Sequence, residues 1–463
     1  MRVILLSGGS GKRLWPLSNG VRSKLFLKLL PDESGNGGKQ SMIQRVCSQL
    51  EEAGLLSATT IVAHENQAEI TANQVGDKLS FIAEPYRRGT FTAVALAAAY
   101  LHDKLQVAPS ETICVMPADI YVESAFFKQL MTFPEVLSQS GTNLALLGTT
   151  PSHPSSQYGY IVPHPIDGTA AVASSSEFLS IARFVEKPDE EVAAGLIDSH
   201  AMWNCGVFAF PLSFMLACLT NKGLPTGYEE LLGCYEQLPE ASFDVEVAET
   251  TAQAVVIPYD KGWKDLGDWR VFPDYFGGSV IGLGELTGDC MQSHIVNELD
   301  CPIHVIGVSN VIVAASTDGI LVADKGKSNQ IKQLLSGSEQ PRSGEKRWGT
   351  YHILDHSKTD AASETLTKKI DMLPGKHTSY HLHASRQETW VILSGTGTFI
   401  LEGVQAPIRS GNVLQIPAGA KHAVLAITRL EYMVIQIGTG LAEEDVRRIA
   451  VTWKDTIRLC TNG

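Results

Sequence analysis

The chain has little positive charge for its length. Its 463 residues include 37 Lys and Arg against 50 Asp and Glu, which gives a formal net charge of −13. A protein this acidic does not hold nucleic acid or an anionic membrane through a general electrostatic field. We therefore expect no nucleic-acid partner, although a local basic pocket for a phosphorylated ligand stays open.

Long hydrophobic runs and paired cysteines are also missing. The apolar run Val3–Leu6 meets a Gly-rich stretch at once, and the longest helix-like apolar segment, Thr92–Leu101, is about half of a membrane span. The eight Cys form no CxxC pair, which in a chain this long is typical of reduced, mostly buried thiols. The sequence predicts a cytoplasmic protein without membrane contact.

The first half alternates short apolar runs with helical patterns. We expect strands at Val3–Leu6, Thr59–Ala63, Thr112–Met116 and Asn143–Leu147, and helices at Ser41–Ala53 and Thr92–Leu105. This alternation predicts an α/β fold with a Rossmann-like, mostly parallel sheet. Ligands of such sheets gather at the carboxyl ends of the strands.

A glycine-rich turn follows the first predicted strand in LSGGSGKRLWPLS. It fits neither the GxGxxG fingerprint nor the GxxxxGK[ST] P-loop. Glycines leave room for a phosphate chain against backbone N–H groups, and nearby cations add positive charge. The residues concerned are Gly8, Gly9, Gly11, Arg13 and Lys24.

Carboxylates follow two further strand-like segments. Asp119 comes directly after Thr112–Met116, and GWKDLGDW, which follows Ala254–Ile257, supplies Asp265 and Asp268. Mg²⁺ typically uses one or two carboxylates together with substrate phosphates and water. Asp119 is therefore a candidate ligand, and either Asp265 or Asp268 could be the second.

Eight motifs in order over the first 270 residues carry a resemblance to a known family. They are LSGGSGKRLWPLS, Lys24 with Phe26-Leu27, EPYRRGT, PAD, YGYI, FVEKP, WNCGVFAF and WKDLGDW. With them the chain resembles the sugar-1-phosphate nucleotidyltransferases, and most closely the two-part mannose-1-phosphate guanylyltransferases. The second half of those proteins resembles a mannose-6-phosphate isomerase.

The resemblance implies a reaction and a role for each matching residue. GTP and mannose 1-phosphate would give GDP-mannose and pyrophosphate, without a covalent nucleophile. Catalysis would fall to Arg13, Lys24, Asp119 and Asp265, the two aspartates holding Mg²⁺. The nucleotide would lie on Gly8, Gly9, Gly11, Glu84 and Arg88, and the sugar phosphate on Gly159, Glu186, Lys187 and Asn204.

Some positions depart from the family pattern. Arg88–Thr92 stands where the family usually has Arg-Asn-Thr-Ala-Pro, and this loop helps to select the base. Asp268 stands where a Ser is common, which we expect to add negative charge near the metal. Two alternatives therefore stay open: the same chemistry on another nucleotide or sugar 1-phosphate, and a non-catalytic sensor of sugar nucleotides.

The last third carries the two-part signature of the cupin family. Gly375, His381, His383, Glu388 and Gly395 fit its first half, and GNVLQIPAGAKHAV fits the second half and supplies His422. Side chains two apart on a strand share a face, so His381 and His383 point the same way. Together with Glu388 and His422 they could bind Zn²⁺, Fe²⁺, Mn²⁺ or Ni²⁺ inside a barrel.

Isomerase activity of this cupin is left open by three departures. The isomerases usually have Gln at His381, and His at Ser385 and at Thr389. The alternatives are an enzyme that interconverts mannose 6-phosphate and fructose 6-phosphate, and a metal-stabilised or regulatory cupin without turnover.

Three segments complete the predicted organisation. We expect a nucleotidyltransferase domain at 1–280, a β-rich connector and linker at 281–345, with a hairpin at 311–324, and a cupin domain at 346–463. LAEEDVRRIAVTW (441–453) predicts a helix with acids early and arginines late. This helix would cap the barrel or contact a second copy of the chain, so a homo-oligomer is a candidate assembly.

Overall fold

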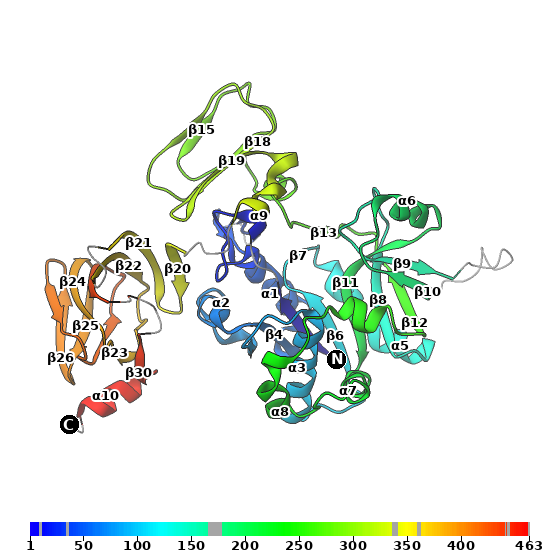
Figure 1. The fold of residues 1–463 in the computed structure, drawn as a ribbon, viewed down its shortest axis with the longest axis horizontal. Coiled ribbons are helices and arrows are strands. Elements are labelled where there is room, and N and C mark those ends of the chain that lie inside the picture. Colours follow the sequence, from blue (N-terminus) through cyan, green and yellow to red (C-terminus); the bar gives the residue numbers. More distant parts are fainter. Residues whose placement is uncertain are drawn as a thin grey trace. The chain divides into compact units, whose positions relative to one another are not determined.

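The computed structural model describes residues 1–8, 12–33, 37–164, 178–335, 341–358, 363–439, 441 and 445–461. Its contacts divide the chain into two compact units. The first contains residues 1–10, 23–68 and 74–277, and the second contains residues 11–22, 69–73 and 278–463. Figure 1 follows the chain in colour from blue at the N-terminus to red at the C-terminus.

A mixed sheet forms the centre of the first unit. In the described residues its strand order is β5 (Ser80–Glu84), β4 (Thr59–His64), β1 (Arg2–Ser7), β6 (Thr112–Pro117), β11 (Met202–Pro211), β8 (Leu144–Thr149), β12 (Ala254–Pro258), β10 (Leu179–Val185) and β9 (Tyr160–Pro163). The first four strands are parallel to one another, as the alternation predicts, and so are β8 and β12.

The remaining strands of this sheet run antiparallel. β11 is antiparallel to β6, β8 and β9, and β10 is antiparallel to β9 and β12. The expectation of a mostly parallel sheet therefore describes its β5–β6 half better than its other half. β8 and β9 both pair with β11, and residues 150–159 lead from one to the other without a helix.

Helices follow the strands of the first unit (Figure 1). They are α1 (Met42–Glu52), α3 (Thr90–Asp103), α4 (Ala125–Leu130), α5 (Phe133–Ser140), α6 (Glu190–Asp198), α7 (Leu212–Asn221) and α8 (Tyr228–Gly233). Most of α2 (Ala68–Val75) groups with the second unit. Ser41 and Gln44 form the predicted capping box of α1. The apolar helix α3 is buried almost throughout and packs with Ile4, Val62 and Val115 of the sheet.

The second unit begins with short strands. β14 (Val280–Ile281), β16 (His294–Asn297) and β18 (Val311–Ser316) pair in parallel, as do β15 (Gly284–Leu286) and β17 (Ile303–Val305). β18 and β19 (Gly319–Asp324) form the predicted hairpin, with Ser316 opposite Gly319.

Two antiparallel sheets build the cupin part of this unit. The first contains β20 (Ser343–Lys346), β21 (Gly349–Lys358), β22 (Glu364–Met372), β29 (Leu430–Gly438), β24 (Arg386–Ser394) and β27 (Val413–Ile416). The second contains β26 (Val404–Arg409), β25 (Thr396–Leu401), β28 (His422–Ala426), β23 (Tyr380–Leu382) and β30 (Arg447–Ala450). Trp390, Phe399 and Tyr432 fill the core between them.

The helix predicted at 441–453 is wrong in its position. Arg447–Ala450 form strand β30, which pairs with β23, and the helix α10 begins only at Trp453 and ends at Thr461. The charge pattern of this segment suits a helix, but pairing with the edge of β23 gives the backbone of Arg447–Ala450 its hydrogen bonds. Part of the predicted helix, residues 442–444, lies outside the described residues.

Two further sequence expectations concern cysteines and membranes. All eight Cys are free thiols, and Cys47, Cys114, Cys205 and Cys290 are buried. No helix in the described residues combines the length and the apolar character needed to cross a membrane.

Candidate functional site

Three predicted residues meet at one point of the first unit. The Lys24 ammonium lies 2.8 Å from Asp119 Oδ2 and 3.1 Å from Asp265 Oδ1. The lysine is 9% exposed, whereas about a third of each carboxylate side chain is exposed. The cluster is therefore a buried cation flanked by two acids that solvent and ligands can reach.

Backbone pairing places the two carboxylates. The Ala118 N–H donates to the Leu6 carbonyl at 3.0 Å, which fixes the turn after β6 against the end of β1. Asp119 is followed by β7 (Ile120–Tyr121), which pairs antiparallel with β13 (Lys264–Asp265), so that Asp265 lies opposite Ile120. The two motifs PAD and WKD are thus joined by a short ladder.

The charge state of Lys24 follows from its neighbours. Burial alone would lower its pKa, but the carboxylates of Asp119 and Asp265 outweigh burial and raise the pKa above its ordinary value. The amine is therefore fully protonated at neutral pH, and it offers a fixed positive charge at the carboxyl end of β6.

The other residues predicted at the phosphates are only partly placed. Gly8 follows β1 and is exposed, and a Cβ there would meet no atom within 4 Å. Gly9 and Gly11 lie outside the described residues. Arg13 lies in the short helix η1 (Lys12–Leu14), in a segment that groups with the second unit. Its role at the nucleotide stays a prediction.

Asp268 is buried in the turn after β13. It is 5% exposed, its carboxylate accepts the Arg270 N–H at 2.9 Å, and its carbonyl accepts the Phe272 N–H at 3.1 Å. These bonds hold the turn after β13. Of the two aspartates proposed as the second Mg²⁺ ligand, Asp265 is the one beside Asp119 and Lys24.

The predicted base loop is anchored to the segment before Asp244. Glu84 at the end of β5 is buried, and its Oε1 accepts the Tyr235 hydroxyl at 2.6 Å. Burial raises the pKa of Glu84, while Tyr235 and Arg87 oppose this shift. The Arg88 guanidinium donates to the Glu236 carbonyl, and the Arg88 carbonyl accepts the Ala241 N–H.

Gly89 explains one departure from the family pattern. Its φ is +87°, and a Cβ built on it would lie 2.2 Å from the Ala241 carbonyl oxygen. The Asn that the family usually has at this position therefore does not fit this backbone. Beside the loop lies a cavity of about 370 Å³, whose lining includes Glu65, Pro85, Tyr86, Tyr228 and Glu236.

The four residues predicted at the sugar phosphate lie on β11 or directly beside β9 and β10: Asn204 is in β11, Gly159 precedes β9, and Glu186 and Lys187 follow β10. The Asn204 N–H donates to the Gly159 carbonyl at 2.8 Å. Glu186 reaches over Gly159, since a Cβ on Gly159 would lie 2.6 Å from Glu186 Oε2. Lys187 has a left-handed backbone with φ +43° and its ammonium contacts the Glu186 carboxylate. A side chain at position 159 would therefore displace the Glu186 carboxylate and the Phe184 ring.

Asp244 joins this group, although no sequence motif singles it out. Its Oδ1 accepts Asn204 Nδ2–H at 2.8 Å, while Asn204 Oδ1 accepts the Gly206 N–H at 3.0 Å. Burial, followed by the nearby Glu186 charge, raises the pKa of Asp244 to about 6. The two bonds fix the orientation of the Asn204 amide.

Asp244 opens a one-turn π-helix, Asp244–Ala248. Such turns occur frequently at functional sites. In the sequence, DVEVAE is typical of an acidic helix start, so only the contact with Asn204 distinguishes this aspartate.

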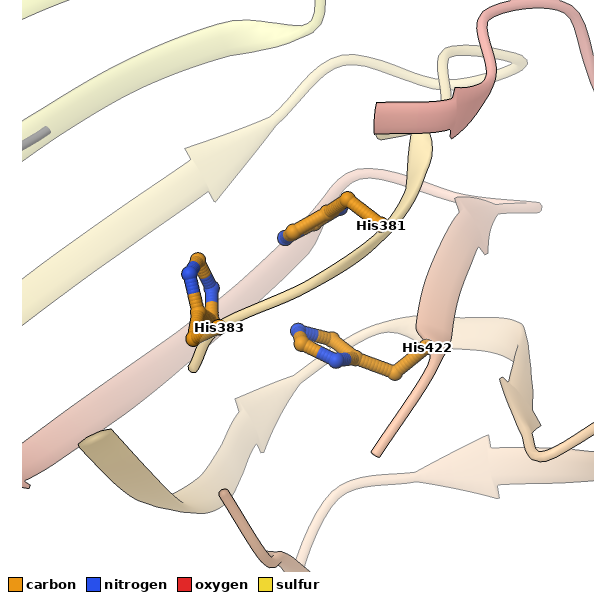
Figure 2. A group of neighbouring side chains, drawn as sticks. All are labelled: His381, His383 and His422. Atoms are coloured by element: carbon orange, nitrogen blue, oxygen red, sulfur yellow. The ribbon is translucent and has the colours of Figure 1, made fainter. Parts of the chain in front are cut away.

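In the second unit, three imidazoles converge (Figure 2). His381 on β23 lies opposite His422 on β28, and His383 follows two residues after His381. One ring nitrogen from each lies within 4.8 Å of the other two. Three nitrogens at this spacing can hold one metal ion.

Backbone carbonyls orient the three rings. His381 Nδ1 lies 2.7 Å from the Ser379 carbonyl, and His383 Nδ1 lies 2.8 Å from the Asp445 carbonyl. His422 Nδ1 lies 3.0 Å from the Ala420 carbonyl. A carbonyl only accepts, so Nδ1 carries the proton and the Nε2 lone pair is left for a metal. His422 Nε2 is buried and has no hydrogen-bond partner among the described residues.

His383 has a second tautomer available. Arg386 Nη2 lies 2.8 Å from its Nδ1, and a guanidinium only donates. With Nδ1 accepting from Arg386, the ring would place its proton on Nε2, 3.2 Å from Glu388 Oε1. Metal binding at Nε2 requires the other tautomer, in which Nδ1–H donates to Asp445.

Burial keeps these imidazoles neutral. It lowers the pKa of His381 and of His383 to about 4, and it lowers the pKa of His422 as well. A neutral imidazole is the form that binds a metal. The ligand set therefore needs no proton removed at neutral pH.

Glu388 is beside the triad but has partners of its own. Its Oε2 accepts Trp390 Nε1–H at 2.8 Å, and its Oε1 accepts Gln436 Nε2–H at 2.6 Å. The metal-binding group formed by the described residues contains the three histidines without Glu388. The carboxylate lies 3.8 Å from His422 Nε2, so it is a neighbour of the three histidines, and its role as the fourth metal ligand stays a prediction.

His381 and His383 line a basic cavity of about 170 Å³. Its lining also includes Lys368, Arg386 and Arg448. One departure from the isomerases supports the site: Ser385 Oγ donates to Asp445 Oδ2 at 2.7 Å, and the Asp445 carbonyl holds His383. The cavity offers a metal position and cations for an anionic ligand.

Comparisons with known proteins agree with this division. The sequence model of the family described as Nucleotidyl transferase matches residues 2–276, and that described as Mannose-6-phosphate isomerase C-terminal matches residues 337–451. The mannose-1-phosphate guanylyltransferase RfbM of Salmonella typhimurium is 30% identical, over 96% of this chain and 96% of its own.

Two other similar proteins extend the comparison. The xanthan biosynthesis protein XanB of Xanthomonas campestris is 29% identical, over 98% of this chain and 99% of its own. A crystal structure from Thermus thermophilus, described as a mannose-1-phosphate geranyltransferase, superposes with a TM-score of 0.59 at 27% identity. The matched region covers 72% of this chain and 97% of the Thermus thermophilus chain.

Proposed function

This chain belongs to the nucleotidyl transferase family and, within it, to the mannose-1-phosphate guanylyltransferases, and from this premise we propose a function. Its first unit makes GDP-mannose from GTP and mannose 1-phosphate. The observation that carries this proposal is the cluster in which Lys24 bridges Asp119 and Asp265. Two carboxylates and a permanent cation are what a phosphoryl-type transfer needs.

The reaction requires alignment and charge neutralisation. A phosphate oxygen of mannose 1-phosphate forms a bond to the α-phosphorus of GTP while the bond to the β-phosphate oxygen breaks, and pyrophosphate leaves. Lys24 and Arg13 would neutralise the phosphates, and Lys187 would bind the sugar phosphate. Gly159, Glu186 and Asn204 would contact sugar hydroxyls, with Gly8, Gly9, Gly11, Glu84 and Arg88 at the nucleotide.

The donor set fits Mg²⁺. Two partly exposed carboxylates match an ion that takes one or two protein carboxylates and completes its shell with phosphates and water. Bound by Asp119 and Asp265, the ion would supply positive charge to the α-phosphate and to the leaving pyrophosphate.

Pyrophosphate release tests this function. Purified protein with Mg²⁺ would be offered GTP, ATP, UTP and dTTP in combination with mannose, glucose and fucose 1-phosphates. We expect turnover with GTP and mannose 1-phosphate, lost in Lys24→Ala and kept in Lys264→Ala, an exposed lysine beside Asp265.

The other outcomes separate the alternatives. Turnover with a different pair would keep the mechanism and place the altered specificity in the base loop around Gly89. Binding of GDP-mannose without release of pyrophosphate from any pair would favour the sensor.

For the second unit we propose a divalent transition metal held by His381, His383 and His422, with Glu388 beside it, and interconversion of mannose 6-phosphate and fructose 6-phosphate. The basic cavity beside three neutral imidazoles supports this second activity. Zn²⁺, Fe²⁺, Mn²⁺ and Ni²⁺ all accept imidazole ligands.

Isomerase assays with each metal test the proposal. Turnover that depends on the metal and is lost in His383→Ala would support it. A metal-loaded cupin without turnover would identify a structural or regulatory domain. A homo-oligomer and a cytoplasmic location stay predictions.

A further inference from the structure

Lys24 occupies the place between two carboxylates that a cation would have to enter. Its ammonium is within 3.1 Å of oxygens from both Asp119 and Asp265, so one charged group spans the proposed Mg²⁺ ligands. A divalent ion that uses the same oxygens cannot bind while the ammonium stays there. The Lys24 ammonium therefore competes with the metal for the same two carboxylates.

The carboxylates are held by backbone, whereas the ammonium is not. Pairing of β7 with β13 and the hydrogen bond from Ala118 to Leu6 fix the two aspartates. Lys24 opens the short helix η2 (Lys24–Phe26), and its ammonium ends a flexible four-carbon stem. Moving the ammonium requires rotations of one side chain and no change in the ladder.

Charge favours such a movement when a nucleotide arrives. In the free protein one ammonium offsets two carboxylates, which leaves a net negative charge. A triphosphate brings several negative charges to the same edge of the sheet, and a lysine ammonium binds phosphate as a point charge. Mg²⁺ then offsets both carboxylates at once.

We propose that Lys24 is a positioning residue that bridges Asp119 and Asp265 in the nucleotide-free protein and moves onto the nucleotide phosphates, so that metal and nucleotide bind together. This inference rests on the proposed nucleotidyltransferase function. It adds to the phosphate-binding role of Lys24 a second one, which acts before the nucleotide arrives. The metal site should then be weak alone and strengthened by nucleotide.

Binding of Mn²⁺, followed by electron paramagnetic resonance, tests the inference without turnover. The full chain would be titrated with Mn²⁺ in the presence and absence of a GTP analogue that cannot be cleaved between its α- and β-phosphates. Binding lost in Asp119→Asn identifies the carboxylate site and separates it from the histidine cluster. In the wild type we expect the analogue to tighten this binding at least about tenfold.

Lys24→Met is the decisive variant. We expect its Mn²⁺ binding without nucleotide to be at least about threefold tighter than that of the wild type, and the further gain from the analogue, whose phosphates still bind the metal, to be smaller than in the wild type. Lys264→Met, one residue before Asp265 and exposed, controls for a general loss of positive charge and should behave like the wild type.

Three results would overturn the inference. One is equal Mn²⁺ affinity of Lys24→Met and wild type without nucleotide. Another is the same gain in Lys264→Met, which would reduce the effect to general electrostatics. The third is the absence of any Asp119-dependent binding in both Lys24→Met and the wild type, and this result would also remove the proposed metal ligands. If the Mn²⁺ results are as expected but the wild type releases no pyrophosphate, the proposed function alone is contradicted.

Discussion

The two sites of this chain use charge in opposite ways. In the first unit, Asp119 and Asp265 lie on turns and short strands, about a third exposed, with a full positive charge between them. In the cupin, His422 and Glu388 are 0% and 4% exposed and lie on strands inside the barrel, where burial keeps the imidazoles neutral.

This difference matches what each site is proposed to bind. A triphosphate carries many charges and must enter and leave, which favours exposed groups that exchange partners. A resident metal needs fixed lone pairs, which favours buried rings held by backbone carbonyls. The first site is therefore completed by its substrate, whereas the second is completed by the fold. The following predictions test that contrast.

Asp265→Asn should have the largest effect, and only on the first site. Loss of one of two charges at the proposed metal should lower pyrophosphate release by about 100- to 1000-fold. The metal content of the cupin should not change. Asp260→Asn, whose carboxylate accepts a hydrogen bond from the Thr150 hydroxyl, is the control. A similar fall in Asp260→Asn would show that the effect is structural.

His383→Ala should act on the second site alone. Removing one of three imidazoles should weaken metal binding by about 100-fold or more, since even loss of an outer partner costs about 10- to 100-fold. Elemental analysis after dialysis measures this change. His356→Ala is the control, because His356 lies 3.4 Å from Glu364 and not in the triad. Equal metal content in His383→Ala and wild type would contradict the assignment.

Asp244→Asn should have a moderate effect on substrate recognition. The Asn side chain can still accept from Asn204 but loses the charge, so we expect KM for the sugar 1-phosphate to rise about tenfold, with KM for GTP unchanged. Glu246→Gln, on the same π-helix and paired with Lys222, should leave both values unchanged. An equal change in the two KM values would assign Asp244 to folding instead.

Acid should have the smallest effect, on the cupin. With the pKa of His381 and His383 near 4, protons compete with the metal only below that value. Metal affinity should therefore change less than about threefold between pH 8 and pH 5, and fall steeply near pH 4. Metal-buffered titrations check this. A loss of tenfold per pH unit between pH 7 and pH 5 would mean that the imidazoles are solvated.

The strands and site residues that could be predicted from the sequence are those that lie in or beside short motifs. β1 and β6 were predictable because each apolar run ends in a turn with its own motif, and β4 was predictable from its apolar run, whereas β5 was not predicted. The H-x-H spacing was sufficient to bring His381 and His383 to one face, and His422 was added by the second cupin motif. In these cases the informative residues are neighbours in the chain.

The remainder depends on contacts between distant segments. Asp244 is 40 residues from Asn204, and nothing in DVEVAE points to that hydrogen bond. The segment 441–453 has the charges of a helix, but β30 forms because the β23 edge is available to pair with it. Likewise, the bonds from Trp390 and Gln436 that engage Glu388 come from packing and not from the cupin motif.

Gly89 limits how this protein could be redesigned or could diverge. Because the Ala241 carbonyl fills the space that a side chain at position 89 would need, a base loop transplanted from a relative with Asn there would displace residues 235–241. That segment also provides Tyr235, which holds Glu84. The two stretches thus constrain each other, and a redesign of the predicted base loop would have to change both.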